Sequence, residues 1–111
     1  MLRLTLLKTI TTALVLHLAS SVIVHAKEPL PVVATFSILG DLVKEIGGEH
    51  VSLTTLVGAN GDAHVYQPTP ADARAVSSAK VLFVNGLEFE GWINRLVSAS
   101  GFKGEQIIST R

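Results

Sequence analysis

Four short runs of mostly apolar and β-branched residues constrain the fold of this chain more than any other feature. They cover residues 32–36, 51–57, 81–84 and 106–108. Short apolar runs rich in Val, Ile and Thr are typical of strands that are buried on both faces of a sheet. Buried strands of this kind occur in sheets that helices cover on both sides, so the runs favour an α/β fold.

The segments between these runs have the spacing of helices. Residues 38–46 carry an apolar stripe, with Ser37 as the expected N-cap and Gly47-Gly48 as the expected end. Residues 71–79 follow a typical helix start, a capping box with Thr69 at the N-cap, Pro70 at N1 and Asp72 at N3. Another apolar stripe begins at Phe89 and is expected to pack in the core. The first stripe consists of Ile38, Leu39, Leu42, Val43 and Ile46, and the second consists of Phe89, Trp92, Ile93, Leu96 and Val97.

Alternating strands and helices predict a parallel four-stranded sheet with helices on both faces. In such sheets ligands bind beyond the carboxyl ends of the strands, where the strand order reverses. Residues 36–37, 58–69 and 85–86 follow the ends of three strands and are expected there. The middle segment is a long irregular loop, and loops of this length usually carry function.

Residues 1–26 have the three-part pattern of a signal peptide. Arg3 and Lys8 precede an apolar stretch that ends at Val24-His25-Ala26, which suits a cleavage site. The alternative is a membrane anchor, but the apolar stretch is short for a span. No Cys follows, so we expect no lipid-anchored N-terminus and a mature protein, from residue 27 onwards, in the periplasm.

The charge of the remaining chain argues against nucleic-acid binding. Arg3 and Lys8 account for two of the nine Lys and Arg residues, so seven remain against nine Asp and Glu. A protein that binds phosphate backbones is normally basic. The chain has no Cys, which excludes a disulfide framework, a thiolate nucleophile and a cysteine zinc site.

The loop after the second strand contains the side chains best suited to a metal. His64 offers a neutral imidazole nitrogen to zinc, manganese or iron. Asp62 could act as a further ligand or could orient the imidazole through its other N–H. Spacing alone favours a surface or hydrogen-bonding role for His64 over a role as a metal ligand. His50 is expected at the opposite end of the sheet, and Glu90 is expected merely to begin a helix.

Three collinear segments resemble one known family, the solute-binding proteins of bacterial zinc and manganese ABC transporters (solute-binding protein family 9). VATFSILGDL, residues 33–42, is similar to the family's first strand and helix. DAHVYQPTP, residues 62–70, is similar to its most diagnostic motif, with Ala63 and Gln67 where Pro and Glu are common. NGL and EGW, within residues 85–92, are similar to the segment after the third strand.

The resemblance implies a two-lobe receptor with metal in the cleft, of which residues 27–111 form an incomplete N-terminal lobe. In the family the His of this motif is the first of four metal ligands, which implies His64 here. The other three lie further along the chain than Arg111. The family captures zinc or manganese for delivery to a membrane permease, so we expect a binding protein rather than an enzyme. The alternatives are a fragment of an exported metal-dependent hydrolase and a metal-binding adhesin.

Overall fold

The computed structural model describes residues 23–24 and 27–110. The predicted signal peptide, residues 1–26, therefore lies outside the described residues except for positions 23 and 24. Among the described residues, no helix combines the length and the apolar character needed to cross a membrane.

The four predicted strands form one parallel sheet. They are β1 (Leu30–Phe36), β2 (Val51–Val57), β3 (Val81–Val84) and β4 (Glu105–Ile108), arranged in the order β2-β1-β3-β4. All of the runs singled out in the sequence are strands, and the predicted α/β class is confirmed. The strand order reverses between β1 and β3, so a ligand site is expected beyond the carboxyl ends of these two strands.

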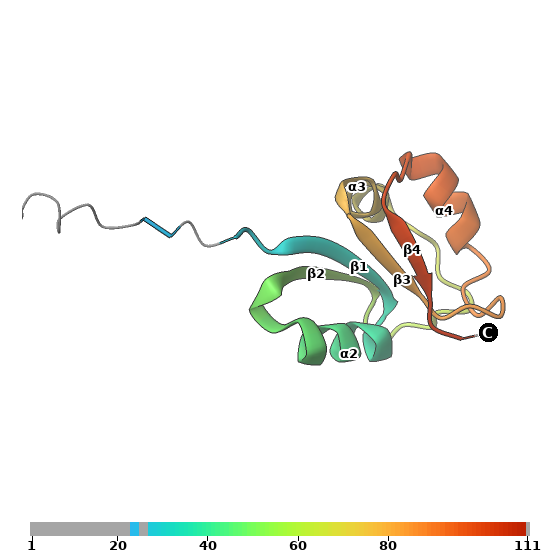
Figure 1. Ribbon diagram of the computed structural model, residues 1–111. Coiled ribbons are helices and arrows are strands. Elements are labelled where there is room, and N and C mark those ends of the chain that lie inside the picture. The colour runs from blue at the N-terminus through green and yellow to red at the C-terminus, as the bar shows by residue number, and fades with distance from the viewer. Residues whose placement is uncertain (1–22, 25–26, 111) are drawn as a thin grey trace, which may run out of the picture.

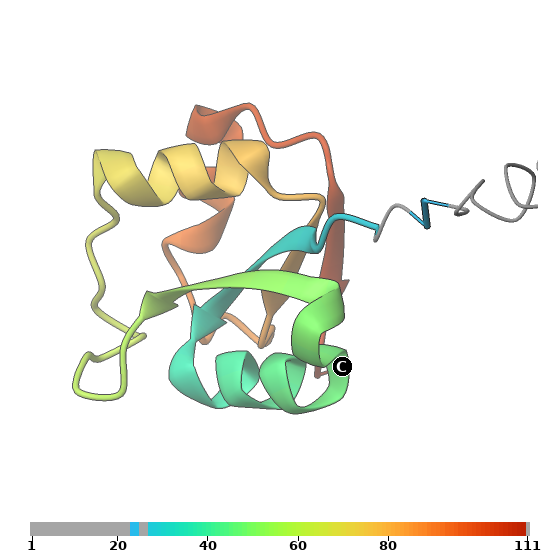
Figure 2. The same ribbon diagram turned by 90° about the vertical axis from the view of Figure 1, so that its left-hand side faces the viewer.

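Helices lie on both faces of the sheet. Helix α2 (Ser37–Gly47), followed by the short 3-10 helix η1 (Gly48–His50), covers one face (Figure 1). Helices α3 (Pro70–Ser78) and α4 (Ile93–Ser100) cover the other. Figure 2 shows α2 and α3 on opposite sides of the sheet. The loop between β2 and α3 runs from one side to the other past the carboxyl ends of the strands.

The ends of α2 and α3 depend on local sequence in different ways. Helix α3 begins at the predicted capping box, in which Thr69 and Asp72 each bond the other's backbone N–H. The predicted Ser37 cap of α2 is wrong, because the N-cap is Phe36 and no side chain bonds the helix start. The predicted end is confirmed: Gly48 has a positive φ of 51°, and its N–H donates to the Lys44 carbonyl.

Helix α4 begins later than its stripe predicts. It starts at Ile93, and the residues before it form a turn rather than a helix. The prediction that a helix begins at Phe89 is therefore wrong, and so is the reading of Glu90 as a residue of the first helical turn. The apolar periodicity continues through the turn because the half-buried ring of Phe89 packs outside the main core, on Phe36 at the end of β1.

The main core lies between the sheet and the helices α3 and α4. Its buried members come from β1, β2, β3, these two helices and the C-cap of α3: Val33, Leu56, Val76, Ala79, Leu82, Val84, Ile93 and Leu96. On the other face, α2 buries only Leu39 from its apolar stripe, while Val43 is half-buried. The other three stripe residues, Ile38, Leu42 and Ile46, are 64%, 54% and 86% exposed.

Candidate metal-binding site

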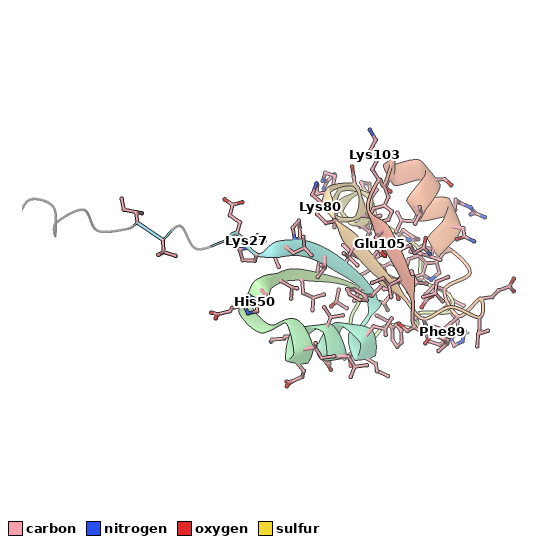
Figure 3. The ribbon with its side chains drawn as sticks, in the orientation of Figure 1. Lys27, His50, Lys80, Phe89, Lys103 and Glu105 are labelled. Atoms are coloured by element: carbon pink, nitrogen blue, oxygen red, sulfur yellow. The ribbon has the colours of Figure 1, made fainter. Side chains whose placement is uncertain are left out.

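The segments expected to bind a ligand do meet at one end of the sheet. The loop of residues 58–69 leaves β2 and passes the end of β1 at Phe36, near the turn that follows β3 at Asn85. In Figure 3, Phe89 lies at this end and His50 lies at the opposite end, as the sequence predicted for His50.

The side chains of His64 and Asp62 are held together within this loop. The backbone N–H of His64 donates to Oδ1 of Asp62 over 2.9 Å, and Nδ1 of His64 lies 3.3 Å from the same oxygen. Both side chains are open to solvent, with 64% and 62% of their areas exposed. A carboxylate beside Nδ1 favours a proton on that nitrogen, which leaves the lone pair of Nε2 free for a metal. This geometry suits the orienting role of Asp62.

The loop is anchored immediately before His64 to Trp92, the N-cap residue of α4. The indole N–H of Trp92 donates to the carbonyl of Ala63 over 2.6 Å. The ring of Trp92 also packs edge-on against Tyr66, with 5.2 Å between the ring centroids. In the sequence His64 thus lies between Ala63 and Tyr66, both of which contact the indole of Trp92.

A second anchor ties the loop to the start of α3. The hydroxyl of Tyr66 donates to Oδ2 of Asp72 over 2.7 Å, and the same oxygen accepts the backbone N–H of Thr69 over 2.8 Å. The hydrogen bond to Asp72 raises the pKa of Tyr66 to about 12, with smaller contributions from burial and from the negative charge of Asp72. The capping box of α3 therefore also fixes the end of the loop that carries His64.

An aromatic side chain that the sequence analysis assigned to the core lies against the imidazole. The ring of Phe89 contacts His64 edge-on with 4.4 Å between centroids, and it packs on Phe36 at 5.0 Å. Phe89 therefore links the end of β1 to the loop that carries His64. One signal could have placed it here: it follows the end of β3 by only five residues, on the side of the sheet where ligands bind.

The part of the chain that the structure describes supplies one strong candidate ligand. Among residues 23–24 and 27–110, no group of three or more His, Cys, Asp or Glu side chains comes together as a metal site. A closed zinc site needs about four protein ligands. The imidazole of His64, with Asp62 beside it, can therefore contribute only part of a coordination shell.

Comparison with known proteins places the whole folded region in one family. The family described as zinc-uptake complex component A, periplasmic, matches residues 32–111. The manganese-binding lipoprotein MntA of Halalkalibacterium halodurans is 49% identical over 70 residues, which cover 63% of this chain and 23% of MntA. The manganese ABC transporter substrate-binding lipoprotein PsaA of Streptococcus pneumoniae serotype 4 is 34% identical over 104 residues, which cover 82% of this chain and 34% of PsaA.

Solved structures have the same fold. The manganese-bound periplasmic metal-binding protein of Candidatus Liberibacter asiaticus superposes with a TM-score of 0.63 at 37% identity, covering 71% of this chain and 29% of that protein. Zinc-bound AdcA from Streptococcus pneumoniae superposes with a TM-score of 0.62 at 22% identity, covering 72% of this chain and 18% of AdcA, and shows the shared fold alone. The chain spans about a quarter to a third of the length of the curated relatives it matches. The family match and the shared fold together show that the chain belongs to the family of periplasmic zinc-uptake complex component A proteins.

Proposed function

We propose that this chain provides the first metal ligand, His64, of the substrate-binding component of a metal ABC transporter. In this proposal the imidazole binds a divalent transition metal through Nε2, and Asp62 holds the ring through Nδ1. The metal is cargo that the protein passes to a membrane permease, and no bond chemistry is required of the chain. We further propose export through a signal peptide that is cleaved after Ala26.

One observation carries the proposal: an exposed imidazole stands on a loop that is anchored on both sides. Trp92 holds the carbonyl of Ala63, and Asp72 holds the hydroxyl of Tyr66. A surface His without a ligand role does not need such support, whereas a metal ligand gains affinity when its position is fixed before binding. The free Nε2 position lies where the strand order reverses, which is the usual ligand site of this kind of sheet.

The relatives indicate which metals to test. Curated relatives are named for manganese and iron, and structural relatives contain manganese, cadmium and zinc. One imidazole is compatible with all of these metals. We propose zinc or manganese as the cargo of this protein. Because the described residues fill only part of a coordination shell, we expect the 111-residue chain alone to bind either metal weakly.

The test follows individual side chains during metal addition, since weak binding escapes most affinity assays. Zinc is titrated into the isotope-labelled chain, and the ring nitrogens of its His residues are observed by NMR. We expect zinc to shift the Nε2 signal of His64 most strongly. Manganese, which broadens nearby signals, is expected to broaden His64 and Phe89 before any residue at the other end of the sheet.

A matched control is available within the same chain. His50 lies on the far end of the sheet and is exposed, as His64 is. His50→Ala should leave the response to both metals intact, whereas His64→Ala should abolish it without unfolding the chain. If the His64→Ala protein still shows the response at residues 62–66, His64 is not the ligand. Tight one-to-one binding that depends on His64 would contradict the expected weakness and point to ligands from a second chain.

A further inference from the structure

Glu90 is a buried acidic residue that the proposed metal site does not use. Only 2% of its surface is exposed. Its Oε1 accepts the backbone N–H of Asn85 over 2.7 Å and the hydroxyl of Thr35 over 3.1 Å, and its Oε2 lies 3.4 Å from the N–H of Gly86. One carboxylate thus joins the carboxyl end of β1 to the turn that follows β3.

The turn held by Glu90 has an unfavourable backbone conformation. Gly86, Leu87 and Glu88 have φ angles of 94°, 54° and 58°. Two of these residues carry a Cβ and therefore enter the left-handed region at a cost in energy. Such conformations persist only where surrounding contacts hold them, and they concentrate at functional sites. A Cβ at position 86 would lie 2.5 Å from Cγ2 of Ile108, so only glycine fits at this position of the turn.

The turn determines where Phe89 lies. The N–H of Phe89 donates to the carbonyl of Gly86 over 3.1 Å, which closes the turn. The ring of Phe89 then contacts the imidazole of His64. A continuous set of contacts therefore runs from the carboxylate of Glu90 through the turn to the ring that is proposed to bind metal.

We propose that Glu90 is a positioning residue for His64. By accepting the N–H groups of Asn85 and Gly86, it holds the strained turn that keeps Phe89 against the imidazole. The orientation of His64 in the metal-free protein depends on this hydrogen-bonded carboxylate. The consequence for metal affinity rests on the proposed function, whereas the consequence for ring position does not.

The test substitutes Glu90 with a side chain of nearly equal shape. In Glu90→Gln the amide presents N–H donors to partners that are themselves donors, so at least one contact to the turn is lost. The readout is the Cε1–H signal of His64 by NMR at fixed pH, because a neighbouring aromatic ring shifts this signal. Phe89→Leu defines the position of the signal when the ring is absent. We expect Glu90→Gln to move the signal towards that position.

Two controls separate positioning from simple loss of stability. Val76→Ala removes methyl groups from the fully buried core on α3, away from the turn, and should lower the melting temperature without moving the His64 signal. In the double variant of Glu90→Gln with Phe89→Leu, the signal should lie where it lies in Phe89→Leu alone. Additive shifts, or a His64 signal unchanged in folded Glu90→Gln, would overturn the proposal.

Thr35→Val keeps the inference testable if Glu90→Gln does not fold. It removes one hydrogen bond to Glu90 while preserving the shape of a buried side chain, and it should move the His64 signal less and in the same direction. An unmoved signal in Thr35→Val would then count against the proposal.

Zinc titration tests whether Glu90 also affects metal affinity. The loss of a group that orients a metal-bound His typically lowers metal affinity by about 10-fold. In Glu90→Gln the zinc concentration that produces half of the His64 shift should therefore rise by about 10-fold. An equal zinc response in Glu90→Gln and the parent would overturn the link to affinity. Failure of the proposed function has a different signature: the parent chain itself would show no zinc response at His64, whatever the metal-free spectra show.

Discussion

The two faces of the sheet are covered to very different extents. On one face, α3 and α4 enclose a continuous core around Leu82, which is completely buried. On the other face, α2 packs on β1 and β2 and leaves three apolar residues of its stripe exposed. Both faces nevertheless carry helices with clear amphipathic patterns, so the pattern alone does not distinguish them.

The comparison shows what helical periodicity measures. A stripe of apolar residues indicates which side of a helix is fit for burial, but it does not say how much of that side finds a partner. Parallel sheets normally have both faces covered. The stripe of Ile38, Leu42 and Ile46 therefore marks a surface whose apolar character exceeds what the described residues bury.

The largest difference between the two faces should appear when a Leu is truncated on each. Leu82→Ala leaves a cavity in the core and should lower the free energy of unfolding by about 2–5 kcal/mol. Leu42→Ala, on a side chain that is 54% exposed, should cost about 1 kcal/mol or less. Urea unfolding followed by circular dichroism measures both. Equal losses would mean that α2 is covered as completely as α3 and α4, for example by a second copy of the chain.

A smaller difference is expected between the starts of the two helices. Thr69→Ala removes the side chain that caps α3 and should cost about 1 kcal/mol of unfolding free energy. Ser37→Ala, at the start of α2, should have almost no effect because no side chain caps that helix. The same unfolding experiment compares them. A cost at Ser37 equal to that at Thr69 would contradict the observed absence of a cap bond.

The hydrogen bond between Tyr66 and Asp72, on the α3 side of the sheet, predicts that the stability of the folded chain falls at high pH. The pKa of Tyr66 is raised from 10.0 to about 12 in the folded chain, so the folded state keeps a proton that the unfolded state loses. The bond's contribution to stability is therefore complete below pH 10 and is lost as the pH rises towards 12. Tyr66→Phe should remove this part of the pH dependence, measured as melting temperature against pH. A slope unchanged in Tyr66→Phe would assign the effect to another group.

The smallest effect on stability is expected at the most exposed residue of the α2 stripe. Ile46 is 86% exposed, so Ile46→Lys should change the free energy of unfolding by no more than about 0.5 kcal/mol. It should, however, reduce association between chains, because it interrupts the exposed apolar surface. Sedimentation velocity over a range of concentrations measures this. A large loss of stability would show that Ile46 is buried in solution.

Much of the fold and the approximate location of the site could be predicted from the sequence. The strand positions, the capping box at Thr69 and the helix end at Gly48 all depend on neighbours within a few residues. The position of the loop with His64 at the carboxyl edge also follows, because parallel strands place successive loops at the same edge. That His64 binds metal remains a prediction drawn from a family resemblance and from the chemistry of imidazole.

The tertiary structure decided the features that join distant parts of the chain. Glu90 bonds Thr35 across 55 residues of sequence, and Trp92 bonds Ala63 across 29. No local pattern contains these pairs, and the apolar spacing around Phe89 predicted a helix where the chain forms a strained turn. The sequence by itself determined the elements, their order and the chemical types available at the ligand edge, because these depend on short-range periodicity and hydrogen bonding. Which apolar residues are buried, and which groups hold the imidazole, were decided only when strands and loops from distant positions packed together.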